Sequence, residues 1–385
     1  MTSVAIIHNH PIHYKHLLFC ALGRCGVDFE VLFTAGSSSN RIEVPLPDKE
    51  QYRYSIGYPG PYEGARMLPT AQFVWSALNR LRPEVLIISG YYDVAAWSGW
   101  LWAERNGVGR ILWAESNEFD HKRHQYREIL KRLFIKRCDY AHVYGHSNRE
   151  YLKRLGMAED KIFIKRAVAD TDLLLKAPVP PSKKRDRITL LYCGRYSPEK
   201  NLPMLFRAFA KASQSVGNAG LVLKLVGYGP LESDLRKLAQ VLGVNDCVEF
   251  AGKASHTELP QIYRSADAFI LPSTSEPWGL VVNEAMLSGL PVAVSNQCGC
   301  AADLVTPETG WTFSPYDETE LIGLLTKIAL TPRVELERMG SAARVLGSEY
   351  SAENCAAVVV QTVDRILRDP SITNDSIPMP DQPQG

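Results

Sequence analysis

The sequence predicts an α/β protein built from two doubly wound domains that face each other across a cleft. With 385 residues, the chain is too long for one typical core. Short apolar runs alternate with helical patterns in both halves, as in parallel sheets covered by helices on both faces. Residues 176–187 are rich in proline and charge and separate the halves. We therefore predict an N-terminal domain over 1–175, this segment as a linker, and a C-terminal domain over 188–350.

The N-terminal half alternates strands and helices in order. The strands are expected at residues 4–8, 29–34, 85–89, 111–115, 141–144 and 162–165. The helices are expected at residues 14–24, 70–81, 94–105, 121–137 and 147–155. Residues 43–61 contain four prolines and several tyrosines, which predicts a long surface excursion rather than a regular element.

The C-terminal half restarts the same rhythm. The strands are expected at residues 188–193, 221–226, 248–250, 268–271 and 292–295. The helices are expected at residues 203–216, 232–242, 258–265, 280–287 and 317–330. A last helix, 351–368, is expected to pack back toward the N-terminal domain. The proline-rich, polar segment 369–385 predicts a disordered tail.

Composition excludes several classes of protein. The formal net charge of +1 is too small to indicate a nucleic-acid partner, so we expect none. The sequence contains no apolar run of the length that spans a bilayer, and it begins without the pattern of a signal peptide, so we expect a cytoplasmic protein. The eight cysteines are scattered, which favours reduced thiols. Cys298-Gly299-Cys300 is weak evidence for zinc, and no metal site is predicted.

Three features of the C-terminal half follow predicted strands. Arg195 and Lys200 lie in the first turn and together form a cationic clamp suited to a diphosphate. Gly227 in the second turn lets a ligand approach the backbone. Glu276 and Glu284 lie in the loop and helix after a later strand. Taken singly, these residues are equally compatible with solvated turns, a helix cap and a surface carboxylate. The carboxyl ends of parallel strands share one edge, so together they predict a ligand site.

The same residues carry a resemblance to a known family. Glu276 and Glu284, with seven residues between them, match the E-x7-E signature of retaining glycosyltransferases of family 4, whose two Rossmann-like domains form the GT-B fold. The segments around Arg195-to-Asn201 and Gly227, and the run 167–172, also look like that family. The resemblance is strong over about 160–310 and looser, in pattern, before it. It implies transfer of a sugar from a nucleotide-diphosphate sugar, with UDP- and GDP-sugars favoured, and with no cofactor required.

The resemblance also implies roles at the donor diphosphate. Arg195 and Lys200 would hold the diphosphate and stabilise the leaving nucleotide. The backbone N–H groups of Gly279 and Leu280, at the start of a helix, would add to this phosphate site.

Other positions would hold the rest of the donor. Glu284 would accept hydrogen bonds from the ribose hydroxyls, and Glu276 would hold hydroxyls of the transferred sugar. Gly227 and the segment around Lys253 would lie near the nucleobase.

The sequence departs from the family pattern in the N-terminal half. Residues 8–14, His-Asn-His-Pro-Ile-His-Tyr, replace the usual Gly-Gly loop. Where many members place a histidine near the reacting carbon, this chain has Glu115 and Ser116, so Glu115 is a candidate catalytic residue. The histidines at positions 8, 10, 13 and 16 are expected either to serve the structure or to contact phosphate or acceptor.

Two features bear on the acceptor, which is expected to be a glycan, a lipid-linked molecule or a small molecule. Tryptophans 97, 100, 102 and 113, with Tyr91 and Tyr92, fit either a core or a sugar-stacking surface. The helix 121–137 has seven basic residues against Glu128 alone. Such a helix is either a solvated face or a peripheral contact with the inner face of an anionic membrane.

Alternatives from other functional classes remain open at this point. A nucleotide-sugar epimerase on the same fold would share the basic turn at 195–200, but the spaced glutamates favour the transferase. A non-catalytic nucleotide-sugar-binding partner is compatible with the departures in the N-terminal half. A nicotinamide dehydrogenase is disfavoured, because no Gly-x-Gly-x-x-Gly follows the first strand of either domain.

Overall fold

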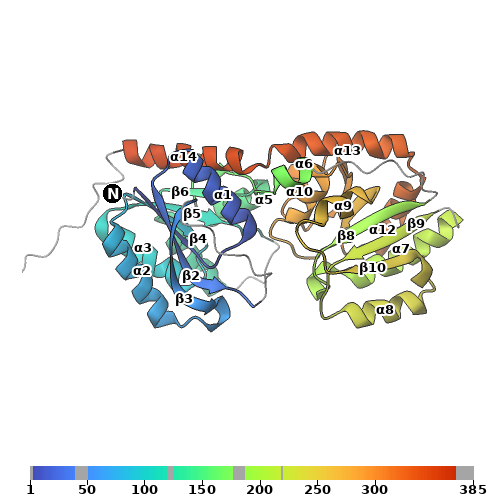
Figure 1. Cartoon of the computed structure of the whole chain (residues 1–385), viewed down its shortest axis with the longest axis horizontal. Coiled ribbons are helices and arrows are strands. Elements are labelled where there is room, and N and C mark those ends of the chain that lie inside the picture. The colour runs from blue at the N-terminus through green and yellow to red at the C-terminus, as the bar shows by residue number, and fades with distance from the viewer. Residues whose placement is uncertain (1–2, 40–50, 119–124, 177–186, 218–219, 370–385) are drawn as a thin grey trace, which may run out of the picture.

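A computed structural model describes residues 3–39, 51–118, 125–176, 187–217 and 220–369. Figure 1 shows two α/β lobes side by side, each built on its own sheet. Among the described residues, the structure contains no helix of the length and hydrophobicity needed to cross a bilayer. Most of the predicted linker, residues 177–186, and the predicted tail, residues 370–385, lie outside the described residues.

The first sheet has seven parallel strands in the order β3-β2-β1-β4-β5-β6-β7. They are β1 (Val4–His8), β2 (Phe29–Ser37), β3 (Arg53–Pro61), β4 (Val85–Ser89), β5 (Gly109–Ala114), β6 (Tyr140–Val143) and β7 (Ile162–Ile164). The helices of this lobe are α1 (His13–Arg24), α2 (Met67–Leu81), α3 (Val94–Asn106), α4 (Gln125–Lys136) and α5 (His146–Arg154).

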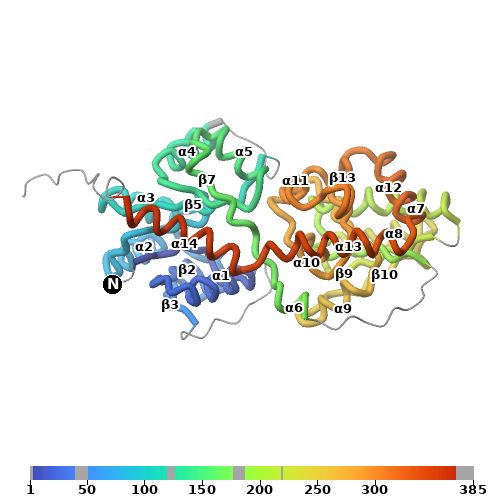
Figure 2. Tube along the Cα trace, turned by 90° about the horizontal axis from the view of Figure 1, so that it is seen from above, coloured from blue at the N-terminus to red at the C-terminus, as the bar shows by residue number. Residues whose placement is uncertain are grey.

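Strands of this sheet are buried on both faces, which is why their sequences are almost continuously apolar. In β1, Val4 and Ile6 face the cluster formed with α1 and α14 (Ala352–Arg368). Ala5 and Ile7 face the opposite cluster, formed with α2 to α5. The C-terminal helix α14 therefore belongs to the core of the first lobe, and Figure 2 shows it running back across that lobe.

The prediction of a surface excursion over 43–61 is wrong for its second part, because β3 covers Arg53–Pro61 at the edge of the sheet. Proline lacks a backbone donor and is tolerated on an edge strand. The prolines that suggested a loop, Pro59 and Pro61, therefore lie in a strand with one unpaired side. Residues 43–50 lie outside the described residues.

The second sheet has six parallel strands in the order β10-β9-β8-β11-β12-β13. They are β8 (Ile188–Cys193), β9 (Leu221–Val226), β10 (Val248–Gly252), β11 (Ala268–Leu271), β12 (Val292–Ser295) and β13 (Gly310–Phe313). Its helices include α7 (Leu202–Val216), α8 (Glu232–Val241), α9 (Leu259–Arg264), α10 (Leu280–Leu287), α11 (Ala301–Leu304), α12 (Glu318–Leu330) and α13 (Arg333–Ser348). The two orders and their parallel strands confirm the predicted pair of doubly wound domains.

The chain crosses between the lobes at two neighbouring segments. The first leads from β7 into the short helix α6 (Thr171–Lys176), and the second leads from α13 into α14. The Ala169 N–H donates to the carbonyl of Tyr350 over 3.2 Å, so the crossings lie side by side. An ion pair between Arg166 and Glu349, at 2.8 Å, joins them a second time.

Candidate active site

The loop after β11 carries the first predicted glutamate and starts α10. Gly279 caps that helix with φ of 103°. A Cβ at this position would lie 3.1 Å from Leu271 Cδ2, so both the backbone conformation and the space favour glycine. The N-terminus of α10 at Leu280 is therefore free of a capping side chain and presents its N–H groups at the edge of the sheet.

Lys200 and Glu276 form an ion pair between two loops of the second sheet. Their side chains are only 15% and 16% exposed, so the pair is largely shielded from water. The Thr274 N–H donates to the carbonyl of Glu199 over 2.9 Å and binds the two loops together. The structure therefore brings together two of the predicted site residues that are 76 positions apart.

Arg195 occupies a more open place. Its side chain is 58% exposed and lies 3.4 Å from Glu199, in the same turn as Lys200. Each cation of the predicted clamp thus contacts a carboxylate of its own. A side chain as exposed as that of Arg195 can reorient toward a ligand at little cost, because a surface ion pair contributes no more than about 1 kcal/mol.

Gly227 has a structural reason to be glycine as well as the predicted ligand role. Its φ is 140°, and a Cβ would lie 1.9 Å from the carbonyl oxygen of Gly194. The turns after β8 and β9 therefore cross in contact. Beside them, the Lys253 ammonium lies 5.2 Å from the centre of the Tyr228 ring, which is 45% exposed. The partly exposed Tyr228 ring and Lys253 thus lie beside the turn where the nucleobase is expected.

Glu284 lies in α10 and accepts a hydrogen bond of 2.7 Å from the hydroxyl of the fully buried Tyr263. Burial raises the pKa of the Glu284 carboxyl, and the Tyr263 hydrogen bond offsets part of this rise. The carboxylate thus has one strong donor and further acceptor positions that a ligand's hydroxyls could use.

The N-terminal lobe contributes a cluster around Glu115, at the end of β5. The carboxylate forms an ion pair with the Lys15 ammonium at 2.7 Å and accepts a hydrogen bond from the Tyr144 hydroxyl at 2.6 Å. Its side chain is 46% exposed. Partial burial raises its pKa, but Lys15 and Lys165 attract the anion more strongly and lower the pKa to about 2. Glu115 is therefore ionised and committed to its partners at neutral pH.

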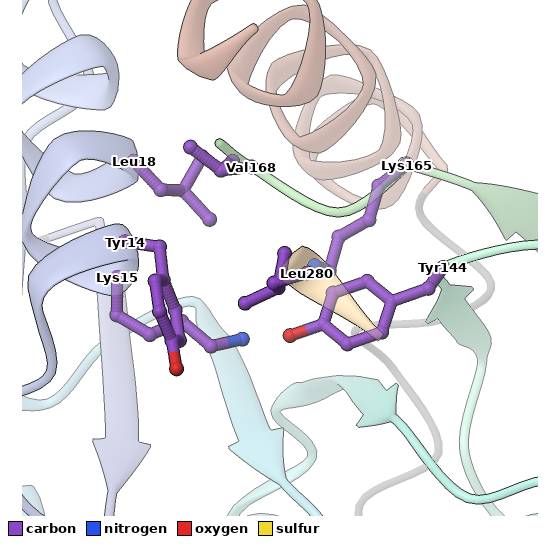
Figure 3. A pocket seen from close by; sticks show the side chains of 7 residues that line it. All are labelled: Tyr14, Lys15, Leu18, Tyr144, Lys165, Val168 and Leu280. Carbon is purple, nitrogen blue, oxygen red and sulfur yellow. The ribbon is translucent and has the colours of Figure 1, made fainter. Parts of the chain in front are cut away.

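A pocket lies next to this cluster, and it joins both lobes. It is lined by Tyr14, Lys15, Leu18, Tyr144, Lys165, Val168 and Leu280. Figure 3 shows the ammonium groups of Lys15 and Lys165 pointing into its centre. Leu280 is the first residue of α10, so the pocket lies beside the helix N-terminus at which the donor phosphates are expected.

Lys165 is buried, with 2% exposure, and burial lowers its pKa to about 8. Its ammonium lies over the rings of Tyr144, at 4.3 Å, and Trp113, at 5.2 Å. None of the ion pairs among the described residues involves this ammonium. A buried cation that faces aromatic rings and has no ion-pair partner, only the longer-range attraction of Glu115, is energetically unfavourable, which marks Lys165 as a functional candidate.

The sequence analysis missed Lys15, Tyr144 and Lys165. One signal was present for Lys165, since it is the last residue of a predicted strand of a parallel sheet, at the edge where ligands bind. Lys15 lies within the first turn of α1 and has no such signal.

The four predicted histidines have different surroundings. His8 is buried, which together with Lys15 lowers its pKa to about 3, and its Nδ1 lies 3.0 Å from the His10 carbonyl. His10 is also buried, and His16 lies beside Tyr52. His13 reaches Asp170 at the crossing between the lobes. Histidines 8, 10 and 16 therefore belong to the packing of the first lobe.

The aromatic cluster is mostly core. Trp100, Trp102, Trp113 and Tyr91 are buried, and Trp97 packs against the same cluster, whereas Tyr92 is 61% exposed. Trp113 donates from Nε1 to His142 Nδ1 over 2.8 Å, and His142 reaches Thr362 of α14. Cys298 and Cys300 are buried as free thiols, and neither belongs to a metal-type cluster of described residues.

A comparison with known families agrees with this geometry. The family model described as "Glycosyl transferases group 1" matches residues 176–345. Residues 176–345 thus resemble the group 1 glycosyltransferases. They include the Lys200–Glu276 pair, Gly227 and Glu284, and the match confirms the glycosyltransferase class predicted from the sequence.

Whole-chain relatives extend beyond this glycosyltransferase domain. A D-inositol 3-phosphate glycosyltransferase of Gordonia bronchialis is 27% identical over 378 residues, which cover 90% of this chain and 82% of that protein. A sulfoquinovosyl transferase of Arabidopsis thaliana is 34% identical over 165 residues, which cover 42% of this chain and 30% of that protein.

Solved structures confirm the GT-B fold of this glycosyltransferase. The Anabaena protein HepE, solved in complex with UDP, superposes with a TM-score of 0.77 at 16% identity and covers 94% of this chain and 100% of its own. A sucrose-phosphate synthase of Thermosynechococcus elongatus superposes with a TM-score of 0.75 at 20% identity, covering 94% and 98%.

Proposed function

We propose that the protein is a retaining hexosyltransferase that moves a sugar from a UDP-sugar to an acceptor hydroxyl in glycoconjugate or polysaccharide biosynthesis. The observation that carries the proposal is the shielded Lys200–Glu276 pair beside the N-terminus of α10. In this proposal, the Lys200 cation and the helix N–H groups oppose the charge of the leaving diphosphate, and the Glu276 carboxylate lies beside the transferred sugar. The solved UDP complex of HepE supports UDP over other nucleotides.

In the proposed reaction, the bond between the anomeric carbon and the phosphate oxygen breaks, and its electron pair stays on the diphosphate. The acceptor oxygen bonds to the same face of that carbon, and its proton passes to the departing phosphate oxygen. Arg195 and Lys200 oppose the charge that develops on the phosphate. Glu284 holds the ribose, Lys253 with Gly227 flanks the nucleobase, and Gly279 and Leu280 contribute N–H groups.

Glu115 has a positioning role in this scheme. A carboxyl with a pKa of about 2 is a poor proton acceptor at neutral pH, so it does not suit general-base chemistry. Through its contact with Lys15 it holds that ammonium at the pocket. Lys15 and Lys165 then attract an anionic group, a phosphate or a carboxylate, of an acceptor that enters between the lobes, since the pocket itself has a volume of only about 10 Å³, the space of one water molecule. The relatives named D-inositol 3-phosphate glycosyltransferases support a phosphorylated acceptor.

The test uses the full chain and a panel of UDP-, GDP-, ADP- and TDP-sugars. We expect UDP to raise the melting temperature most, and a UDP-sugar to be transferred to an acceptor with retained anomeric configuration, followed by NMR. An inverted product would refute the retaining mechanism. Conversion of the donor alone into an epimer would favour the isomerase, and nucleotide binding without turnover on any acceptor would favour a non-catalytic partner.

We propose in addition that α4 contacts an anionic membrane. Tyr126, Ile129, Leu130 and Leu133 are 48–66% exposed and repeat at a spacing of three and four residues, so they share one helix face. Basic side chains that are also exposed flank this face: Arg127, Arg132 and Lys136. Arg137, after the end of α4, pairs with Glu104. Lys131 is not part of it, because its ammonium pairs with Glu128 and Tyr151.

Vesicle sedimentation tests this contact. The protein should bind vesicles that contain phosphatidylglycerol and bind phosphatidylcholine vesicles much less, because cations and exposed apolar side chains act together. Ile129→Glu should abolish binding without unfolding the protein, whereas Val345→Glu, on the exposed face of α13, should not change it. Equal binding by the Ile129 variant and the parent would refute the role of α4.

A further inference from the structure

Three side chains from separate segments meet at the crossing between the lobes. His13 begins α1 in the first lobe, Asp170 lies in the crossing segment, and His256 lies in the loop before α9 in the second lobe. His13 Nε2 lies 2.9 Å and His256 Nε2 lies 3.1 Å from the same oxygen, Oδ2 of Asp170. The centres of the two imidazole rings are 4.1 Å apart.

The carboxylate of Asp170 is held in place by its other oxygen. Oδ1 accepts a hydrogen bond of 3.0 Å from the N–H of Leu173, in the first turn of α6. Oδ2 is thereby turned toward the two histidines. The Asp170 side chain is 15% exposed, while His13 and His256 are 32% and 40% exposed, so the cluster is partly shielded and still open to solvent on one side.

The geometry points to a divalent transition-metal site: we propose that His13, Asp170 and His256 bind an ion of the Zn²⁺ class. The three ligand atoms lie within 4.8 Å of one another. Ligands at about 2.0 Å from a tetrahedral ion are separated by about 3.3 Å. The two distances to the shared Asp170 oxygen are within a few tenths of an ångström of that value, so small side-chain movements open the space for an ion.

The ligand types define which ions fit. Two imidazole nitrogens and one carboxylate oxygen suit Zn²⁺, Co²⁺ or Ni²⁺, whereas Mg²⁺ and Ca²⁺ prefer oxygen ligands throughout. Three protein ligands leave a fourth position for water or another molecule, as in open zinc sites. The exposed side of His256 provides the access to that position.

The site has a consequence for the arrangement of the lobes. Its ligands come from the first lobe, the crossing and the second lobe, so an ion bound to all three holds the lobes at one separation. Binding to this arrangement alone would stabilise it by mass action. The proposal does not depend on the transfer reaction, because it concerns residues outside the pocket and outside the Lys200–Glu276 pair.

Co²⁺ is a suitable probe, because its absorption spectrum reports its ligands. Untagged full-length protein, cleared of metal with a chelator, should bind one Co²⁺ with the spectrum of nitrogen and oxygen ligation. His13→Ala and His256→Ala should each weaken binding at least about tenfold, because each removes one of three ligands. His146→Ala is the matched control, since that histidine also contacts a carboxylate, Asp303, across the lobes but without a second histidine.

The spectrum also separates this site from the free cysteines. An intense thiolate-to-cobalt band in place of the histidine type would place the ion on cysteine and overturn the proposal. So would the absence of stoichiometric binding, or equal affinity in the parent and both histidine variants. Circular dichroism and melting temperature should match the parent for His256→Ala, whose side chain lies in a partly exposed loop, so a loss of binding in this variant reports the ligand itself.

Discussion

Replacing Lys165 by methionine should stabilise the protein and impair its reaction with an anionic acceptor. The side chain is 2% exposed, and its contacts fit an apolar chain of similar length. Burial lowers the pKa of the ammonium from 10.5 to about 8. The charged form is therefore unfavourable in the folded state, and the methionine variant escapes this cost.

Two opposing effects set the change in the free energy of unfolding that Lys165→Met should cause. A pKa depressed by about 2.5 units corresponds to about 3 kcal/mol of destabilisation at neutral pH. The aromatic rings of Trp113 and Tyr144 favour the cation by about 2 kcal/mol. We therefore expect Lys165→Met to raise the free energy of unfolding by about 1–2 kcal/mol at pH 7.

The pH dependence has a definite sign. Between pH 8 and 10.5 the unfolded chain keeps the Lys165 proton while the folded chain releases it, so stability rises with pH in this window. The advantage of the methionine variant should be complete below pH 8 and should shrink as the pH rises toward 10.5. Urea unfolding followed by tryptophan fluorescence reports mainly the first lobe, because five of the seven tryptophans precede residue 114.

The effect of Lys165→Met on stability and its effect on the acceptor KM can be refuted separately. A methionine variant less stable than the parent at pH 7 would show that the buried ammonium is stabilising, contrary to the reasoning from its burial. A stable variant with an unchanged KM for a phosphorylated acceptor would remove Lys165 from the acceptor site. Lys161→Met, at an exposed position just before β7, is the matched control and should change neither quantity.

Three further outcomes are expected. Lys200→Ala should lower kcat at least about 100-fold, because it removes charge that opposes the leaving phosphate, and should also lower the melting temperature, because it leaves the shielded Glu276 carboxylate without its partner. Lys211→Ala, at an exposed ion pair, should not change kcat. Gly227→Ala should cost about 2 kcal/mol or more of stability because its Cβ meets a carbonyl oxygen, whereas Gly243→Ala, with positive φ but open space, should cost about 1 kcal/mol in urea unfolding. Tyr263→Phe should raise the pKa of Glu284, because it removes the hydrogen bond that favours the ionised carboxylate. When the solution is acidified, the UDP affinity of this variant, measured by calorimetry, should therefore begin to fall at a higher pH than that of the parent.

The residues of the proposed donor site could be found from the sequence alone, because they follow strands that are neighbours in one sheet. Gly194 to Lys200, Gly227 and Glu276 each lie in a turn after an apolar run, and parallel strands bring those turns to one edge. The fold was predictable for the same reason, since strands such as β1 and β4 are continuous apolar runs. The roles of these residues toward a donor stay predictions.

The pocket between the lobes, the proposed acceptor site, was not predictable in this way. It takes Lys15 from a helix, Tyr144 and Lys165 from the ends of two strands, and Leu280 from the other lobe. No spacing in the sequence records a contact between such distant segments. The edge strand β3 was missed for a local reason, because prolines normally interrupt strands and only an edge position tolerates them.

One short segment connects the two sites. Lys165 lines the pocket, and Asp170, five residues later, is the central ligand of the proposed metal site. The intervening Arg166 has φ of 65°, a conformation that costs a residue with a side chain about 1 kcal/mol or more, and it is held by the ion pair with Glu349. A rotation of the lobes must turn this crossing, so it would separate His13 from His256 and move Lys165 relative to Leu280 together. A metal ion that holds the histidines would therefore also hold the pocket between the lobes in its present arrangement.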